Sequence, residues 1–458
     1  MTIDAMSSEG HGIARPDGKV VFVEGAVPGD VVTARTYKRR KSFDHARITE
    51  LHTPSDRRTE TFCPHVEACG GCKWQHIGYD HQAAFKQDTV EQAIRRIGGL
   101  DGVEMAPIVP ARDTRHYRNK LEFTFSRHRY MSPEEIATGE DIDNRHGLGF
   151  HAPGIFDKVV DVTTCYLMDE RQDHIRNTAR RLAIESGRPF YKQRDHSGFY
   201  RNLVVRNTTL DEWMVVVIFG EDDQTAQDDF LNALVAECPV ITSGWAITNT
   251  KWNDSYADLE PRHVHGTQTI TEQLGHIRFG IGPTSFFQTN TVQAVRLFDE
   301  VADLAGLSGT ETVYDLYAGV GSIGLYLAKD AARVVGIEVV DEAVEDATRN
   351  AALNGIDHAS FHCGDVRALL DVDFLAAHGR PDVLVTDPPR AGMHPDVVNV
   401  LLQSDVPRIV YVSCNPSTQA RDLHLLADRY DVLEGRPVDL FPHTPHVENV
   451  ALLTLRDR

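Results

Sequence analysis

The pattern of hydrophobic and polar positions changes twice along the chain and predicts three domains. Residues 1–55 alternate β-branched and polar positions around Gly and Pro turns, as in "KVVFVEGAVPGDVVTARTY", which predicts a small β-barrel. Residues 56–275 hold a cysteine-bearing segment, a helix at 81–99 and strand-like runs such as "EWMVVVIFG", which predict a β-rich central domain. The helix at 81–99 ends at a Gly-Gly pair and is expected to pack on the third domain.

Residues 276–458 alternate strands with helical patterns. The apolar runs "ETVYDLYAG", "ARVVGIEVV", "DVLVTDPPR" and "RIVYVSCNPS" are separated by segments of helical period, and "VENVALLTL" is a last strand. This alternation predicts a doubly wound, Rossmann-like parallel sheet. Ligands of such sheets bind beyond the carboxyl ends of the strands. The whole chain is thus predicted to be a multidomain α/β protein.

Composition narrows the class of protein. The chain has 458 residues with 41% hydrophobic and 25% charged residues, no apolar run long enough to span a membrane, and no signal-peptide pattern at its start. We therefore expect a cytoplasmic protein without a membrane partner, acting as a monomer. The net charge of -20 argues against non-specific nucleic-acid binding, including to DNA. The exception is a basic segment at residues 33–47, which is either a solvated hairpin or a local phosphate-binding patch.

The cysteines suggest a metal site. Cys63, Cys69 and Cys72 form a C-x5-C-x2-C cluster, and Cys165 lies far downstream. Four thiolates suit zinc or an iron-sulfur cluster. Structural zinc sites more often use two close pairs, so three clustered cysteines plus a remote one favour iron-sulfur, although zinc stays open.

A glycine loop predicts a nucleotide-containing cofactor. Gly319, Gly321 and Gly324 form G-x-G-x-x-G after a strand, and Glu338 ends the following strand, where it could accept hydrogen bonds from ribose hydroxyls. The loop fits a dinucleotide or S-adenosylmethionine (SAM). Alternatively, the glycines only form a tight strand-helix turn that binds no ligand. The later "TDPPR" favours SAM, because Asp-Pro-Pro at this place recurs in SAM-dependent methyltransferases of nucleic-acid bases. Arg390 replaces the aromatic residue of amino-group methylating enzymes, which points to a carbon target.

Methylation of a pyrimidine C5 needs two further groups. A thiolate must add to C6, and a base must later remove the C5 proton. Cys414 follows the next strand after Asp387, and Glu448 begins the final strand. Taken singly, Cys414 could be a small buried strand-end residue and Glu448 a solvated acid.

Together these motifs resemble a known family. "FFQTN", "DLYAGVGSIGL", "TDPPRAG", "VYVSCNPST" and "FPHTPHVENVALL" occur in the order and spacing of the bacterial RNA uracil-5 methyltransferases. The resemblance covers essentially the whole chain. The cysteine cluster and a start that resembles a TRAM domain are most similar to the branch that acts on 23S ribosomal RNA.

The resemblance implies a set of site residues. Cys414 would be the nucleophile and Glu448 the base, and Gln288 and Asp387 would reach the edge of the target base. Cys63, Cys69, Cys72 and Cys165 would hold a [4Fe-4S] cluster. The SAM and uracil pocket would be lined by Gln288, Tyr317, Gly319, Ser322, Glu338, Asp365 and Asp387; Ser322 stands where some members have Asn.

The substrate implied is an RNA with an accessible base. Chemistry at C5 and C6 requires an unstacked, flipped uracil, and unstacking a base costs less free energy in an RNA loop than in a duplex. Arg118, Lys120 and Arg206 are further candidates for backbone contacts, or else surface ion pairs. The same chemistry on transfer RNA is the nearest alternative. An NAD-dependent oxidoreductase would leave "DPPR" and "SCNPST" unexplained, and a non-catalytic RNA-binding protein would have no use for both Cys414 and Glu448.

Overall fold

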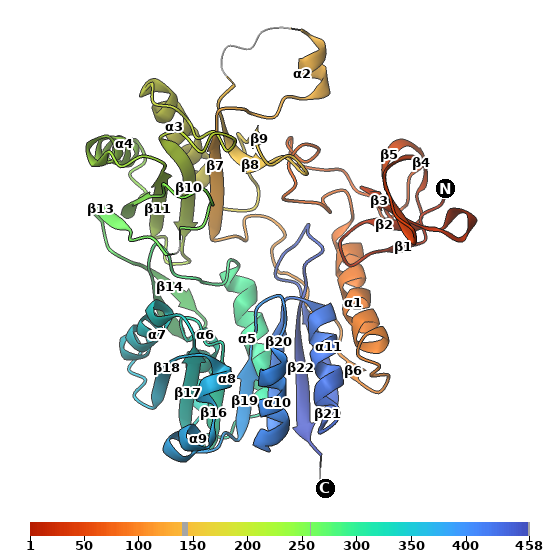
Figure 1. Cartoon of the computed structure of the whole chain (residues 1–458), viewed down its shortest axis with the longest axis vertical. Coiled ribbons are helices and arrows are strands. Elements are labelled where there is room, and N and C mark those ends of the chain that lie inside the picture. Colours follow the sequence, from red (N-terminus) through yellow and green to blue (C-terminus); the bar gives the residue numbers. More distant parts are fainter. Residues whose placement is uncertain (140–144, 257, 457–458) are drawn as a thin grey trace.

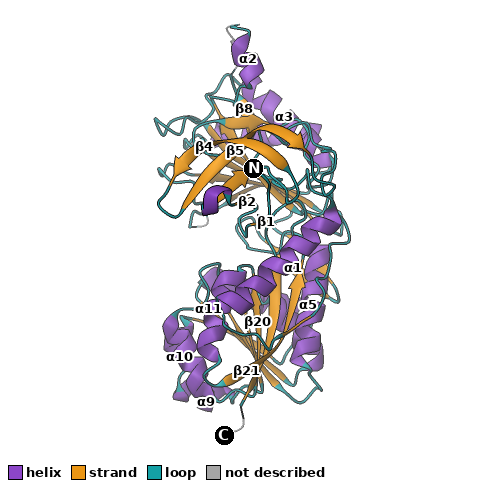
Figure 2. Cartoon of the chain, turned by 90° about the vertical axis from the view of Figure 1, so that its right-hand side faces the viewer, coloured by secondary structure: helices purple, strands orange, loops and turns teal. Residues whose placement is uncertain are grey.

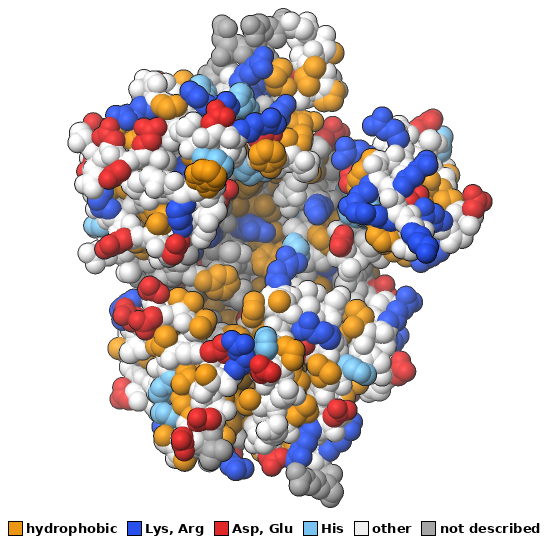
Figure 3. Space-filling view, viewed as in Figure 1, with side chains coloured by type: hydrophobic (Ala, Val, Ile, Leu, Met, Phe, Trp, Pro, Cys, Tyr) orange, Lys and Arg blue, Asp and Glu red, His pale blue; other side chains and the backbone are white. Residues whose placement is uncertain are grey.

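The chain folds into three parts that meet around one hollow. The computed structural model describes residues 1–139, 145–256 and 258–456. A small β-unit lies to one side, a mixed unit lies above, and the C-terminal α/β unit lies below (Figure 1). Figure 3 shows the face of the molecule hollowed between these parts, with Lys and Arg side chains inside the hollow. Within the described residues no helix has the length and apolarity needed to cross a membrane.

The N-terminal unit is a five-stranded sheet in the order β1-β2-β3-β5-β4. Because apolar and polar positions alternate along its strands, Val21, Val23, Val32 and Ala46 lie on one side and form a small core. The long hairpin of β4 (Val31–Arg39) and β5 (Phe43–Thr53) is largely exposed. The strands are β1 (Ala5–Met6), β2 (Gly12–Ala14), β3 (Val20–Glu24), β4 (Val31–Arg39) and β5 (Phe43–Thr53).

The central unit is a seven-stranded sheet whose middle strands are buried on both faces. In β11, Trp213, Val215 and Val217 pack under the helices α3 and α4, whereas Met214 and Val216 pack toward the C-terminal unit. The two helices were not predicted, so the unit is α/β rather than only β-rich. Its elements are β7 (Lys120–Ser126), α2 (Pro133–Ala137), β8 (Gly147–His151), β9 (Val159–Asp161), α3 (Arg171–Glu185), β10 (Tyr200–Asn207), β11 (Trp213–Phe219), α4 (Gln224–Glu237), β12 (Ser243–Thr248) and β13 (Arg262–Gly266).

A hairpin joins the central and C-terminal units. Its strands are β14 (Ile270–Leu274) and β15 (Ile277–Ile281), so the boundary proposed at 275/276 falls in its turn. Ile270 and Phe279 of the hairpin share one core with Val216 of the central sheet and Leu297 of the C-terminal unit. The two units are therefore packed together through a continuous apolar core.

The C-terminal unit contains an eight-stranded sheet in the order β18-β17-β16-β19-β20-β22-β21-β6. The strands from β18 to β20 are parallel, as predicted, but β22 runs antiparallel to β20, and β21 antiparallel to β22. The strands are β6 (Glu104–Met105), β16 (Thr312–Leu316), β17 (Arg333–Glu338), β18 (Ala359–Cys363), β19 (Val383–Thr386), β20 (Arg408–Ser413), β21 (Tyr430–Val438) and β22 (Glu448–Leu455). The helices are α5 (Thr291–Ala305), α6 (Ser322–Leu327), α7 (Asp341–Leu353), α8 (Val366–Leu369), α9 (Val372–His378), α10 (Pro395–Ser404) and α11 (Pro416–Leu426).

The helix α1 (Tyr79–Arg96) packs on this C-terminal unit, against α11 and β21 (Figures 1 and 2). Its Lys86 is fully buried, with Nζ 2.5 Å from Asp439 Oδ1 and donating to the Phe441 carbonyl at 2.9 Å. Tyr79 donates from its hydroxyl to Asp439 Oδ2 at 2.9 Å. These bonds fix the segment that leads to Glu448.

Breaking this buried ion pair should destabilise the protein strongly. Lys86→Met leaves the Asp439 carboxylate buried without its cation, which is expected to lower the unfolding free energy of this unit by about 3–5 kcal/mol. Urea unfolding measures the change. Arg95→Met, on the same helix, removes an exposed pair with Glu91 and should cost less than about 1 kcal/mol. Equal, small losses in both variants would contradict the role given to Lys86.

Candidate active site

Cys414, the predicted nucleophile, lies at the carboxyl edge of the C-terminal sheet. Asp387 follows β19, Cys414 follows β20, and these two strands are parallel neighbours. Ser413 pairs with Asn449 across the antiparallel β20–β22 ladder, so the next residues out along that ladder are Cys414 and Glu448. The direction of β22 thus brings the start of the last strand beside the end of β20, and places an acid next to the cysteine.

Two loops are tied together around Cys414. Asn415 caps α11 by accepting from the Ser417 amide, and its Nδ2 donates to the Arg390 carbonyl at 2.9 Å. Gln419 Nε2 donates to the Asn449 carbonyl at 3.1 Å, and Asn449 Nδ2 donates to Gln419 Oε1 at 2.7 Å. The Asn-Pro turn therefore starts a helix and also links the Asp-Pro-Pro loop and β22 to the cysteine loop.

The electrostatics of this edge are unusual because three acidic groups share it. Glu448 is 7% exposed. Burial and then the charge of Asp387, against the opposing effect of Arg390, raise its pKa to about 8. Burial also raises the pKa of Asp387 to about 7. Burial, then the charges of Glu448 and Asp387, raise the pKa of the Cys414 thiol to about 11. The charge of Asp387 thus raises the pKa of both Cys414 and Glu448, whereas the positive charge of Arg390 lowers the pKa of both.

The glycine loop has the backbone geometry of a cofactor loop. Tyr317, Gly319 and Gly321 all have positive φ, and a side chain at Gly321 would lie 2.8 Å from the Phe361 ring. The amide of Gly319 donates to Glu338 Oε2 at 2.9 Å. Glu338 ends β17, so its carboxylate lies at the carboxyl edge of the sheet, as the sequence predicts.

The remaining residues of the predicted cofactor pocket surround this loop. Ser322 is the first residue of α6, and Asp365 caps α8, where its ion pair with Arg367 lowers its pKa to about 2. The charge of Asp365 also raises the pKa of Tyr317, after burial, so these two groups face the same region. Their contacts with a cofactor stay a prediction.

Asp315 is a supporting residue that sequence reasoning missed. It is buried in β16 and accepts from the Gly324 amide at 2.8 Å, which fixes the start of α6. Burial raises its pKa to about 7. The acid at this place in "DLYAG" was the available signal.

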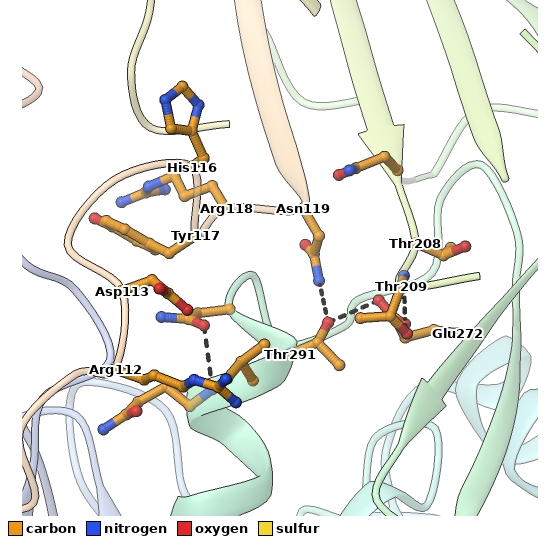
Figure 4. Close-up of a pocket in the computed structure, with 14 residues that line it drawn as sticks. Arg112, Asp113, His116, Tyr117, Arg118, Asn119, Thr208, Thr209, Glu272 and Thr291 are labelled. Atoms are coloured by element: carbon orange, nitrogen blue, oxygen red, sulfur yellow. Dashed lines mark hydrogen bonds between the residues drawn. The ribbon is translucent and has the colours of Figure 1, made fainter. Parts of the chain in front are cut away.

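The loop that carries Gln288 is held by a second network that the sequence did not reveal. Asn119 donates to the Gln288 carbonyl at 2.9 Å. Figure 4 shows that Asn119 also donates to Thr291 Oγ1, at 2.9 Å, and that Thr291 donates to Glu272 Oε2 at 2.7 Å. Glu272 is fully buried and also accepts from the Thr209 amide at 2.9 Å. The central unit thus fixes the backbone of the loop before α5.

The three basic candidates of the central unit differ from one another. Arg206 is buried, donates to the Ser285 carbonyl at 2.6 Å, and so holds this same loop rather than presenting itself to a ligand. Burial and then the charge of Arg206 lower the pKa of Lys120 to about 8. Arg118 lies against the Phe441 ring at 5.4 Å. The earlier alternative of surface ion pairs is wrong for Arg206.

The four predicted metal-binding cysteines line one cavity of about 130 Å³ in the central unit. Burial raises the pKa of all four thiols, to about 11 for Cys72 and about 12 for Cys165. In the described part of the chain, no group of three or more His, Cys, Asp or Glu side chains is placed to hold a metal ion. The metal site is therefore not confirmed, although the topology does bring its proposed donors together.

The basic hairpin of the N-terminal unit is exposed at its tip. Arg35, Lys38, Arg39, Arg40 and Lys41 are exposed, and none of them makes an ion pair with another described residue. Arg47 instead pairs with Glu24 at 2.8 Å. Figure 3 shows Lys and Arg side chains gathered on this unit.

Comparison with known proteins identifies the family. Residues 260–456 match the tRNA (uracil-5-)-methyltransferase family, and residues 1–48 match the TRAM domain. An uncharacterized RNA methyltransferase of Porphyromonas gingivalis is 46% identical over 99% of both chains, and one of Bacteroides thetaiotaomicron is 45% identical over 98% of this chain and 100% of that one. The crystal structure of Pyrococcus abyssi tRNA (uracil-54, C5)-methyltransferase in complex with S-adenosyl-L-homocysteine has a TM-score of 0.76 and 29% identity, covering 99% of this chain and 100% of that one. This chain belongs to the RNA (uracil-5-)-methyltransferase family and carries a TRAM domain at its N-terminus.

Proposed function

We propose that the protein methylates C5 of a specific uridine in 23S ribosomal RNA, with Cys414 as nucleophile and Glu448 as base. The observation that carries this proposal is the placement of both residues at the ends of neighbouring strands, beside Asp387. SAM supplies the sulfonium-activated methyl group, and its positive charge favours ionised neighbours. The residues proposed to hold SAM lie in or beside the glycine loop: Tyr317, Gly319, Ser322, Glu338 and Asp365.

The residues of the chain perform the covalent steps. The Cys414 thiolate adds to C6 of the uracil, and the electron pair of the C5–C6 double bond moves toward the C4 carbonyl as an enolate. After C5 has been methylated, Glu448 removes the C5 proton. The electron pair of that C–H bond restores the double bond, and the thiolate leaves. Gln288 and Asp387 are proposed to hold the edge of the flipped base.

Covalent trapping tests the chemistry and the choice of RNA together. Wild-type protein with SAM and a 5-fluorouracil-containing 23S fragment should form a stable adduct, because C5 carries fluorine where Glu448 must remove a proton. Denaturing electrophoresis should show the adduct, and Cys414→Ala should lose it completely. Cys238→Ala, at a buried cysteine outside the site, is the matched control. An adduct that persists in Cys414→Ala would refute the nucleophile.

Transfer RNA is the second candidate substrate. The family description and the Pyrococcus abyssi enzyme both concern tRNA, whereas the TRAM domain and the cysteine cavity are the features that favour rRNA here. The same trapping reaction with 5-fluorouracil-containing tRNA distinguishes them: adduct on tRNA alone would move the proposal to tRNA.

Release of the methylated product should depend on pH through Glu448. Its raised pKa of about 8 means that it holds its proton at neutral pH, so the carboxylate form needed to take the C5 proton grows as pH rises. Resolution of the adduct with unmodified RNA should therefore accelerate between about pH 6 and about pH 9. In Glu448→Gln the adduct should persist, at least about 100-fold longer, with no such pH dependence. Rapid release by Glu448→Gln would exclude it as the base.

We also propose that Cys63, Cys69, Cys72 and Cys165 hold a [4Fe-4S] cluster. The support is the chemistry of the donor set. One buried and three partly buried thiols line one cavity with apolar walls, and a bound cation would reverse the rise in their pKa values. The cluster would attach the segment that carries Cys63, Cys69 and Cys72 to the central unit through Cys165.

Metal content tests this assignment without reference to activity. Protein purified without oxygen should be brown and contain about four irons and four sulfides per chain. Cys165→Ala should lose most of the iron, whereas Cys238→Ala should retain it. A colourless protein, or one that binds a single zinc ion, would refute the cluster.

A further inference from the structure

The central unit contains an open groove that the proposed chemistry does not use. Its volume is about 740 Å³. None of its lining residues belongs to the glycine loop, to the cysteine and acid at the sheet edge, or to the cysteine cavity. The residues that the argument uses are Phe156, Tyr191, Arg194, His196, Trp252 and Asp254.

Two aromatic side chains of this groove are unusually exposed. Trp252 is 80% exposed, more than any other large apolar side chain described, and Phe156 is 67% exposed. The His196 ring stacks on Trp252 at 5.0 Å with an interplanar angle of 3°. Aromatic faces left in water cost free energy unless a ligand covers them.

The loop that presents Trp252 is rigidly held. Arg201 is 1% exposed, and its Nη1 donates to the carbonyls of Asn249 at 2.7 Å and Lys251 at 2.8 Å. Its Nη2 donates to the Asn253 carbonyl at 2.9 Å and to Asp254 Oδ1 at 2.8 Å. A buried guanidinium with four bonds to one loop fixes the tryptophan in place before any ligand binds.

The second loop of the groove is attached to the same arginine. The Arg201 guanidinium lies 4.2 Å from the centre of the Tyr191 ring, at the start of the loop that carries His196. His196 has a φ of 51°, in the left-handed region that non-glycine residues seldom occupy. Backbone strain of this kind persists where the surrounding structure enforces it, commonly at binding sites.

The acidic side chains at the groove are neutralised by ion pairs, although the protein as a whole is acidic. The carboxylates of Asp157, Asp195 and Asp254 are each paired, with Arg194, Lys192 and Arg201 respectively. Arg127, whose amide donates to the Tyr191 carbonyl, and Lys158, next to Asp157, make no ion pair with any described residue. These two cations lie on segments that adjoin the groove, and cations near exposed aromatic rings suit a polyanion that carries bases.

We propose that this groove stacks unpaired bases of the substrate RNA and so holds the strand away from the reacting uridine. This inference rests on the proposed function only in taking RNA as the substrate. Single-stranded RNA fits better than a protein partner, because the Trp252 and Phe156 rings offer stacking faces and the unpaired cations suit phosphates.

Tryptophan fluorescence provides a direct test, since Trp74, Trp213 and Trp245 are buried and only Trp252 is exposed. Full-length protein is titrated with a fluorescein-labelled single-stranded RNA of about 12 nucleotides. Binding is followed by fluorescence anisotropy, and stacking by quenching of the protein emission with the unlabelled RNA. The quenching should disappear in Trp252→Phe.

Affinity gives the second measurement. Trp252→Ala should raise the Kd for this RNA by about 5- to 100-fold and raise KM for methylation without a matching loss of kcat. Trp252→Phe should retain most of the affinity, and Leu353→Ala, at a 54% exposed apolar residue of the C-terminal unit, should change nothing. RNA binding without quenching, or an unchanged Kd in Trp252→Ala, would overturn the proposal. Both results are expected if the groove binds a protein partner instead of RNA.

The outcome is separable from that of the proposed chemistry. If the groove does not bind RNA, Trp252→Ala still forms the Cys414 adduct with 5-fluorouracil RNA and does so at wild-type affinity. If the uracil chemistry is wrong, the wild type forms no adduct, while RNA still quenches Trp252.

Discussion

The structure depends on how the segment between β21 and β22 is fixed, because this segment delivers Glu448 to Cys414. The fully buried Lys86 of α1 pairs with Asp439 at its start. Gln82 accepts from the His443 amide at 2.8 Å in its middle. A buried charge pair is a specific constraint rather than a large gain in stability, because desolvation offsets much of the attraction. Here it fixes the register of one loop.

The same segment connects all three parts of the molecule. Trp74 donates from its backbone amide to the His443 carbonyl at 2.9 Å and from its ring to the Gly10 carbonyl at 3.1 Å, which links the segment to the TRAM domain. Tyr117 of the central unit donates to the Pro442 carbonyl at 3.0 Å. The position of Glu448 is therefore coupled to the N-terminal and central units. The Asn119–Thr291–Glu272 network likewise couples the loop of Gln288 to the central unit.

Much of the architecture was accessible from local patterns. The strand-loop-helix alternation, the glycine loop and the strand ends that carry Glu338, Asp387 and Cys414 follow from periodicity and turn residues. The helices α3 and α4 are not predicted from the sequence, because their apolar positions lie among many charged and polar residues. The antiparallel direction of β22 is not predicted either, because the hydrophobic period does not encode strand direction. The sequence predicts Arg206 at the surface, because a guanidinium in a strand gives no sign of its burial.

The sequence by itself determined the family, the fold class and the residue types of the site, because motif order and period are local properties of a chain. Tertiary structure alone decided which groups meet. The ladder of β20 and β22 brings Glu448 beside Cys414, and burial then raises both pKa values in a way that no spacing can reveal. The exposed Trp252 likewise looks like an ordinary apolar residue in the sequence. Only the fold shows that it stays 80% exposed beside the His196 ring and that the buried Arg201 holds its loop.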